Sequence, residues 1–304
     1  MLNLSQYSKS SSKPSFLFHL YALFTVAIWG ATFVSTKVLL NAGLHAVEIY
    51  IYRFVLAYIL ILPFCKRLWA NNLKDELLLA LGGLTSGSIY FIAENTALKY
   101  TLVSNVSLLT SISPLLTTLL IGFFYKQEKP KAGVYIGSMV ALVGVTLVVF
   151  NGGMSMQIMP LGDLIAFSAA VSWAFYSIII RKLNVVYDAL FITRKTFFYG
   201  IVTAIPFLAF EPEICDPAVL LQSDVLLNLL FLGIVASMIC YFIWAIAMRE
   251  LGTVKANNYM YLQPVFTLVL AFIVLEEKIS ILGYAGCALI LVGLWLSGKL
   301  GKKK

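Results

Sequence analysis

The stretch AIWGATFVSTKVL, residues 27–39, returns later in the chain as VSWAFYSIIIRKL, residues 171–183. The alignment places Trp29 on Trp173 and keeps the apolar and basic positions in register. Each copy opens a longer series of matching segments. The match therefore marks the beginning of two equivalent halves, and any fold for this chain has to contain both.

Two further pairs of segments extend the duplication. Residues 104–120, SNVSLLTSISPLLTTLL, align with residues 254–270, VKANNYMYLQPVFTLVL, and a proline stands at the same place in both. After a slip of one residue, 128–145 align with 277–294, with two glycines in register. The halves meet near residue 155. An apolar chain made of two such copies is typical of secondary transporters.

The composition places this chain in a lipid bilayer. Of its 304 residues, 61% are hydrophobic and only 12% are charged, which leaves too few polar side chains to cover a water-facing surface. The net charge of +8 comes from short basic clusters between apolar stretches, so we expect no nucleic-acid partner. The cysteines lack the spacing of a metal site, which predicts single buried thiols and no metal or cofactor: Cys65, Cys215, Cys240 and Cys287.

Ten stretches are apolar and long enough to cross a bilayer, which takes about 20 mostly apolar residues in a helix. None shows the alternation of a membrane barrel strand. The predicted fold is an all-α polytopic membrane protein with ten transmembrane helices. They lie at about 18–38, 46–64, 77–98, 103–124, 132–150, 161–180, 189–210, 225–248, 254–275 and 279–297.

The ten spans divide into two five-helix repeats, residues 18–150 and 161–297. A polar N-terminal tail, 1–17, precedes them, and a basic tail, 298–304, follows. Because each repeat holds an odd number of spans, the second copy enters the membrane from the opposite side. The two repeats are therefore predicted to be inverted, an arrangement in which exchanging the conformations of the halves alternates access.

The lysines and arginines orient the bundle. On one side of the predicted spans they are numerous, whereas the opposite loops hold only Lys99 and Lys278, and the longest of these loops, residues 211–224, is acidic. Cytoplasmic loops carry the excess of basic residues in membrane proteins. We therefore expect both termini, and both tails, in the cytoplasm and the protein in the plasma (inner) membrane.

Several elements recur at the same places in both halves. They are Trp29-Gly30, Pro114, Glu128-Lys129 and Gly137 with Gly144, matched by Trp173-Ala174, Pro264, Glu277-Lys278 and Gly286 with Gly293. In this order they resemble the EamA-type, ten-helix members of the drug/metabolite transporter superfamily, over about 20–150 and 161–297. The resemblance implies a helical basket with a central cavity, and proton-coupled or facilitative transport of small metabolites, often amino-acid export.

Glu94 is the most unusual residue, because it lies inside the third span while its repeat counterpart is Trp244. A carboxylate in lipid costs about 2.5–3.5 kcal/mol even on insertion scales. With Tyr90 one turn away on the same face, Glu94 is a candidate proton acceptor or anchor for a substrate amine. The structural alternative is an ion pair with Arg53 of the second span, at a similar predicted depth. The two interpretations are compatible if the pair breaks during transport.

Polar residues precede the proline of the fourth and ninth spans. Proline removes a backbone hydrogen bond, which is tolerated where the freed carbonyl meets a cavity or a polar neighbour. In the ninth span, Asn257, Tyr261 and Gln263 are candidate substrate-binding residues. In the fourth span, Ser107 and Ser111 are candidates too, although their pattern favours hydrogen bonds between helices.

Tryptophans and glycines complete the pattern. Trp29 and Trp173 lie deep in the first span of each half, where an indole either flanks a substrate or packs in the core. The glycine-rich faces of the fifth and tenth spans predict close helix packing, either within the bundle or between the protomers of a homodimer.

These features predict a secondary transporter, most simply an exporter of small polar metabolites such as amino acids, with alternating access around a central cavity and coupling to protons as one option. An enzyme is disfavoured, because the only histidines, His19 and His45, lie near span ends and no intramembrane catalytic motif is present. A channel would need a ring of repeated polar groups. A carrier of nucleotide sugars, drugs or lipid-like cargo, or a membrane scaffold, remains the alternative.

Overall fold

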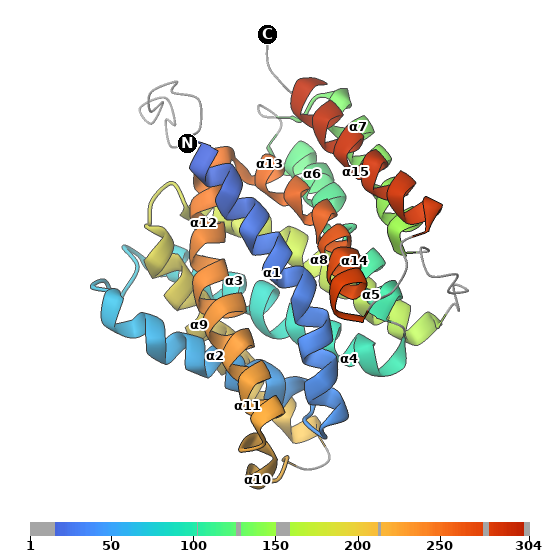
Figure 1. Cartoon of the computed structure of the whole chain (residues 1–304). Coiled ribbons are helices and arrows are strands. Elements are labelled where there is room, and N and C mark those ends of the chain that lie inside the picture. The colour runs from blue at the N-terminus through green and yellow to red at the C-terminus, as the bar shows by residue number, and fades with distance from the viewer. Residues whose placement is uncertain are drawn as a thin grey trace.

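The protein is described by a computed structural model over residues 16–101, 103–125, 129–149, 159–211, 214–275 and 280–300. Within these ranges every regular element is helical and none is a strand, which confirms the all-α prediction. The helices stand together in one bundle (Figure 1). Of the predicted features, most of both tails, Glu128 and the turn Glu277-Lys278 lie outside the described residues.

The first half of the chain forms a series of apolar helices, and a π-helical segment, Leu84–Ile89, joins two of them without a break. A short 3-10 turn, Leu62–Phe64, extends the second helix. The α-helices are α1 (Phe16–Asn41), α2 (Ala46–Ile61), α3 (Leu73–Gly83), α4 (Tyr90–Tyr100), α5 (Val103–Thr110), α6 (Ser113–Phe124) and α7 (Ala132–Val149).

The second half repeats this order. A π-helical segment, Phe231–Ile239, again lies within a long helix, and 3-10 turns occupy Ile205–Phe210 and Tyr259–Leu262. The α-helices are α8 (Pro160–Leu183), α9 (Ala189–Ala204), α10 (Pro217–Leu220), α11 (Ser223–Leu230), α12 (Cys240–Leu251), α13 (Thr253–Asn258), α14 (Gln263–Leu275) and α15 (Ile281–Leu300).

Eight helical runs among the described residues are long and apolar enough to cross a membrane. Two predicted spans, 189–210 and 254–275, are helical but do not belong to these eight. The first contains Arg194 and Lys195, two charged residues that lower its mean hydropathy. Residues of this kind are tolerated at membrane depth where neighbouring helices cover them, and Arg194 and Lys195 are both buried.

Both prolines of the duplicated pattern stand immediately after a break in the helix. The chain leaves α5 at Thr110 and starts α6 at Ser113, one residue before Pro114. In the second half a 3-10 turn separates α13 from α14, whose second residue is Pro264. Proline at the start of a helix lacks the N–H that would have no partner there, which explains why each break falls at this position.

The glycine faces of α7 and α15 pack against each other, as a pair at one edge of the bundle (Figure 1). A Cβ atom on Gly144 would lie 2.7 Å from the carbonyl oxygen of Gly286, and one on Gly293 would lie 2.5 Å from the backbone nitrogen of Ala141. Backbones this close leave no room for a side chain. These glycines therefore serve packing within the chain.

Candidate functional site

Six of the ten sequence-predicted candidates, from five helices, converge on a small central cavity of about 20 Å³. Space of this size holds about one water molecule and no larger solute. Six of the nine residues that line the cavity are candidates from the sequence. The lining residues are Trp29, Thr32, Arg53, Tyr90, Phe91, Glu94, Trp173, Tyr241 and Gln263.

Two indoles, Trp29 and Trp173, line this site, and a third, Trp244, packs behind Trp29. The ring centroids of Trp29 and Trp173 are 5.3 Å apart, and that of Trp244 lies 5.1 Å from Trp29. The Trp29 Nε1–H donates to the backbone oxygen of Ala236 at 3.0 Å, and Gln263 donates to the Trp29 carbonyl at 3.2 Å. The buried indole is thus held in a fixed orientation at the point where the two halves meet.

Two opposite charges face the same cavity without pairing directly. Arg53 on α2 and Glu94 on α4 are 1% and 3% exposed, yet no ion pair within 4 Å joins them among the described contacts. Arg53 instead donates from Nε to the Ser237 hydroxyl at 2.9 Å, and its guanidinium carbon lies 4.6 Å from the ring centroid of Phe91. The site therefore offers one cationic and one anionic group a short distance apart, which suits the two ends of a zwitterion.

Asn257 lies behind the cavity wall and not in it. Its amide oxygen accepts hydrogen bonds from Trp173 Nε1 at 3.0 Å and from the Ser177 hydroxyl at 3.2 Å, while its nitrogen donates to the Thr253 carbonyl. Tyr261 is likewise fully buried and does not line the cavity. Asn257 consequently positions an indole that faces the site.

The serine pair of the fourth span lies outside the cavity as well. The Ser111 hydroxyl donates to the Ser107 carbonyl one turn earlier, at 2.7 Å, just before the break that precedes Pro114. This bond is local to the helix and does not connect two helices. Both serines are buried, and neither lines the central cavity.

Thr32, Phe91 and Tyr241 line the cavity but were not among the candidates. Thr32 stands one turn after Trp29, so helical spacing could have found it. Tyr241 lies just beyond the π-helical segment Phe231–Ile239, and its hydroxyl donates to the carbonyl of Ser86 in the other π-helical segment, at 3.1 Å. π-Helical segments leave irregular carbonyls and often mark functional sites. Sequence periodicity gives no signal for them.

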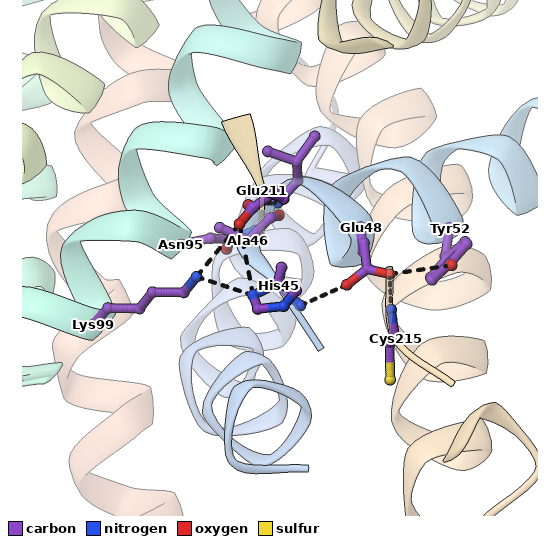
Figure 2. Close-up of polar contacts among 9 residues, drawn as sticks. His45, Ala46, Glu48, Tyr52, Asn95, Lys99, Glu211 and Cys215 are labelled. Carbon is purple, nitrogen blue, oxygen red and sulfur yellow. Dashed lines mark hydrogen bonds and ion pairs between the residues drawn. The ribbon is translucent and has the colours of Figure 1, made fainter. Parts of the chain in front are cut away.

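At the end of the bundle opposite the termini, the two halves are tied by a group of polar residues, here named the outer cluster: His45, Glu48, Lys99, Glu211 and Cys215 (Figures 1 and 2). Glu211 Oε2 lies 3.6 Å from His45 Nδ1 and 3.8 Å from Lys99 Nζ. Glu48 accepts from the backbone N–H of His45 at 2.9 Å and of Cys215 at 2.8 Å. Because Glu211 and Cys215 belong to the second half, the outer cluster links the two halves at this end.

The chain was compared with known proteins. The model of the EamA-like transporter family matches it twice, over residues 17–150 and 160–298. An "Uncharacterized transporter" of Archaeoglobus fulgidus is 29% identical over 289 residues, covering 92% of this chain and 96% of the relative. A "Probable amino-acid metabolite efflux pump" of Escherichia coli is 26% identical over 285 residues, covering 91% and 93%. One solved crystal structure shares the fold, with a TM-score of 0.73 over 95% of this chain and 98% of its own, at 20% identity.

Proposed function

Since the chain belongs to the EamA-like transporter family and is a multi-pass membrane transporter, we propose that it exports small zwitterionic metabolites, with amino acids as the principal class. The observation that carries this proposal is that Glu94 and Arg53, two opposite charges without a direct ion pair, line the same aromatic-walled cavity. A free amino acid presents an ammonium group to the carboxylate and a carboxylate to the guanidinium. The name of the Escherichia coli relative agrees with this class.

The proposed mechanism is alternating access by two inverted five-helix repeats, with ten spans and the termini on the cytoplasmic side of the inner membrane. The central cavity of about 20 Å³ is too small for an amino acid, so the halves must separate before cargo reaches it. The outer cluster holds them together at one end, which supports a conformation closed toward the outside. Protons coupled through Glu94 would supply the driving force.

The transport proposal predicts exchange of amino acids by purified protein in proteoliposomes. Vesicles loaded with unlabelled L-phenylalanine should accumulate labelled L-phenylalanine above the level of protein-free vesicles. A second set, loaded with and offered a phosphorylated sugar, should accumulate nothing, because the central cavity offers a dianion one guanidinium, that of Arg53, and no second cation among its described lining residues. Accumulation of the sugar phosphate in a preparation that exchanges no amino acid would contradict the proposal.

The inverted topology predicts that reporters at the two ends of the bundle lie on opposite sides of the membrane. A fluorescent protein fused after Lys304 should fold in the cytoplasm and fluoresce. Alkaline phosphatase inserted between Asp216 and Pro217, beyond the outer cluster, should be active in the periplasm of a bacterial host. Activity of both reporters on the same side would contradict the orientation and, with it, the inversion of the repeats.

A further inference from the structure

A second cavity, of about 770 Å³, lies near the end of the bundle that carries the termini, between α6, α7, α8, α12, α13 and α15. Its volume falls in the range of sites that enclose whole small molecules. Five basic side chains line it, and no acidic one does so among the described residues. The basic residues are Lys129, Lys131, Arg181, Arg249 and Lys255.

The cations differ in how firmly they are held. Arg181 is partly buried at the end of α8, and its guanidinium carbon lies 4.5 Å from the ring centroid of Tyr125. Lys255 is exposed, with Nζ 3.5 Å from Nε2 of His19 on α1. Several positive charges around one cavity focus the field there and raise the local concentration of anions. Arg181, stacked and oriented, is the best placed to contact a carboxylate.

Much of the remaining lining is apolar. Four different elements contribute apolar surface to the same space, through Ile121, Met248, Leu262, Leu291 and Leu294. Burying an aliphatic or aromatic side chain against such a surface stabilises a complex, because apolar area is removed from water. The cavity therefore matches a molecule that carries both an anionic group and an apolar group.

Only a thin partition separates this cavity from the central site. Asn258 and Leu262 line the large cavity, while Gln263, the next residue along the chain, lines the central one. The partition contains the 3-10 turn Tyr259–Leu262, in the interruption between α13 and α14. Such a break, held by few helical hydrogen bonds, is a natural place for movement.

From this arrangement we infer that the large cavity, here named the basic vestibule, is the first binding site for cargo arriving from the termini side, and that it selects molecules with a free carboxylate and a large apolar side chain. The inference rests on the proposed transport function and narrows its substrate class. Among amino acids it favours phenylalanine and leucine over glycine, and it disfavours esters and amides that lack the carboxylate.

The first test uses three probes with the full-length protein in a neutral detergent at low ionic strength. L-Phenylalanine should bind about fivefold to tenfold more tightly than L-phenylalaninamide, as expected for the loss of one charge-assisted contact. L-Phenylalanine should also bind at least about tenfold more tightly than glycine, because glycine fills none of the apolar surface. Equal affinity for the acid and the amide would overturn the inference.

The second test locates the binding. The double variant Arg181→Gln, Lys255→Gln should lose about fivefold to tenfold in affinity for L-phenylalanine and bind L-phenylalaninamide unchanged. The matched control is Lys182→Gln, Lys299→Gln, which removes the same charge from the same helix end of α8 and from α15 without touching the vestibule lining. An equal loss in the control would overturn the inference.

If the Arg181 variant does not fold, the exposed pair Lys129→Gln, Lys131→Gln replaces it, against the same control.

The same binding measurement in nanodiscs distinguishes a cargo site from a lipid-binding site. Basic pockets near a bilayer surface also bind anionic lipid, so the nanodiscs should contain about 10 mol% phosphatidylglycerol. If this lipid abolishes the difference in affinity between L-phenylalanine and L-phenylalaninamide, the cations bind anionic headgroups and the inference is overturned. An unchanged difference supports it.

Binding and transport report separately on the two proposals. One outcome is that the protein prefers L-phenylalanine over the amide through the lining cations and yet exchanges no amino acid in vesicles. This result would support the basic vestibule as a binding site and contradict the proposed transport function. Conversely, the protein could exchange L-phenylalanine and L-phenylalaninamide at equal rates, with affinities that the Arg181 and Lys255 changes do not alter. This result would support the proposed transport function and overturn the inference about the basic vestibule.

Discussion

The Glu94→Gln variant should exchange amino acids about tenfold more slowly than the wild type or worse, which corresponds to the loss of one charge-assisted contact. The amide preserves the volume and one hydrogen-bonding oxygen of the side chain, so the fold should survive. It removes both the negative charge and the bound proton, so the remaining transport should also lose its dependence on pH. Exchange in proteoliposomes across a series of pH values measures both effects.

The competing explanation is that Glu94 only neutralises Arg53. Removing one partner of a fully buried pair costs about 3–5 kcal/mol, and the double variant with Arg53→Gln would then regain stability. The geometry argues against this, because the Arg53 guanidinium is already held by Ser237 and Phe91. We therefore expect the melting temperature of Glu94→Gln to stay near that of the wild type. Glu250→Gln, the same change at an exposed site, is the control.

Wild-type exchange by a stable Glu94→Gln protein would contradict a functional role for this carboxylate. A large fall in melting temperature, restored by Arg53→Gln, would assign it to structure instead. The two variants together with Glu250→Gln thus separate transport from folding. The pH profile adds a measurement that a purely structural role would not change.

The Gly293→Leu variant should lose most of its folded protein. A Cβ atom at this position of α15 would lie 2.5 Å from the backbone nitrogen of Ala141 and 2.6 Å from the carbonyl oxygen of Gly137, and backbone atoms cannot move aside. Overpacking a tight contact costs about 1–3 kcal/mol even where side chains can adjust. The yield of monodisperse protein and its melting temperature measure the effect.

Gly298→Leu on the same helix is the matched control, because a Cβ atom there has no neighbour within 4 Å. It should fold like the wild type. The same pair of variants addresses the alternative role of the glycines in a homodimer. If Gly293→Leu leaves the melting temperature unchanged and converts a dimer to a monomer, its glycine face joins protomers and not α7 to α15.

Because the chain is duplicated, much of the central site could be predicted from the sequence. Matching the halves singles out Trp29 and Trp173, and it pairs Glu94 with Trp244; three of these four line the cavity, and Trp244 packs against Trp29. An unusual residue type in an apolar helix is a strong signal because lipid makes it costly. That physical cost, more than periodicity, identified Glu94 and Arg53.

Other members of the site give no such signal. Tyr241 is one of 16 tyrosines, and it reaches the cavity because a π-helical segment changes the rotation of the helix before it. Asn257 carries the polarity expected of a ligand, yet the tertiary fold directs its amide to Trp173. Glu211 lies in a stretch that resembles an exposed acidic loop, and only the folded chain brings it to His45 and Lys99.

The outer cluster also makes the two halves energetically unequal. Continuing the match of Glu94 with Trp244, a step of 150 residues, Lys99 corresponds to Arg249. Lys99 joins the other half through Glu211, whereas Arg249 pairs with its own neighbour Glu250 beside the open vestibule. An exposed pair is worth about 0.2–1 kcal/mol, so it shifts a two-state ratio by up to about fivefold. In a carrier with two identical halves, the two end states of the proposed alternating access would be equally populated. Under that proposal, we expect this asymmetry to favour, in the empty protein, the state that is open toward the side of its termini.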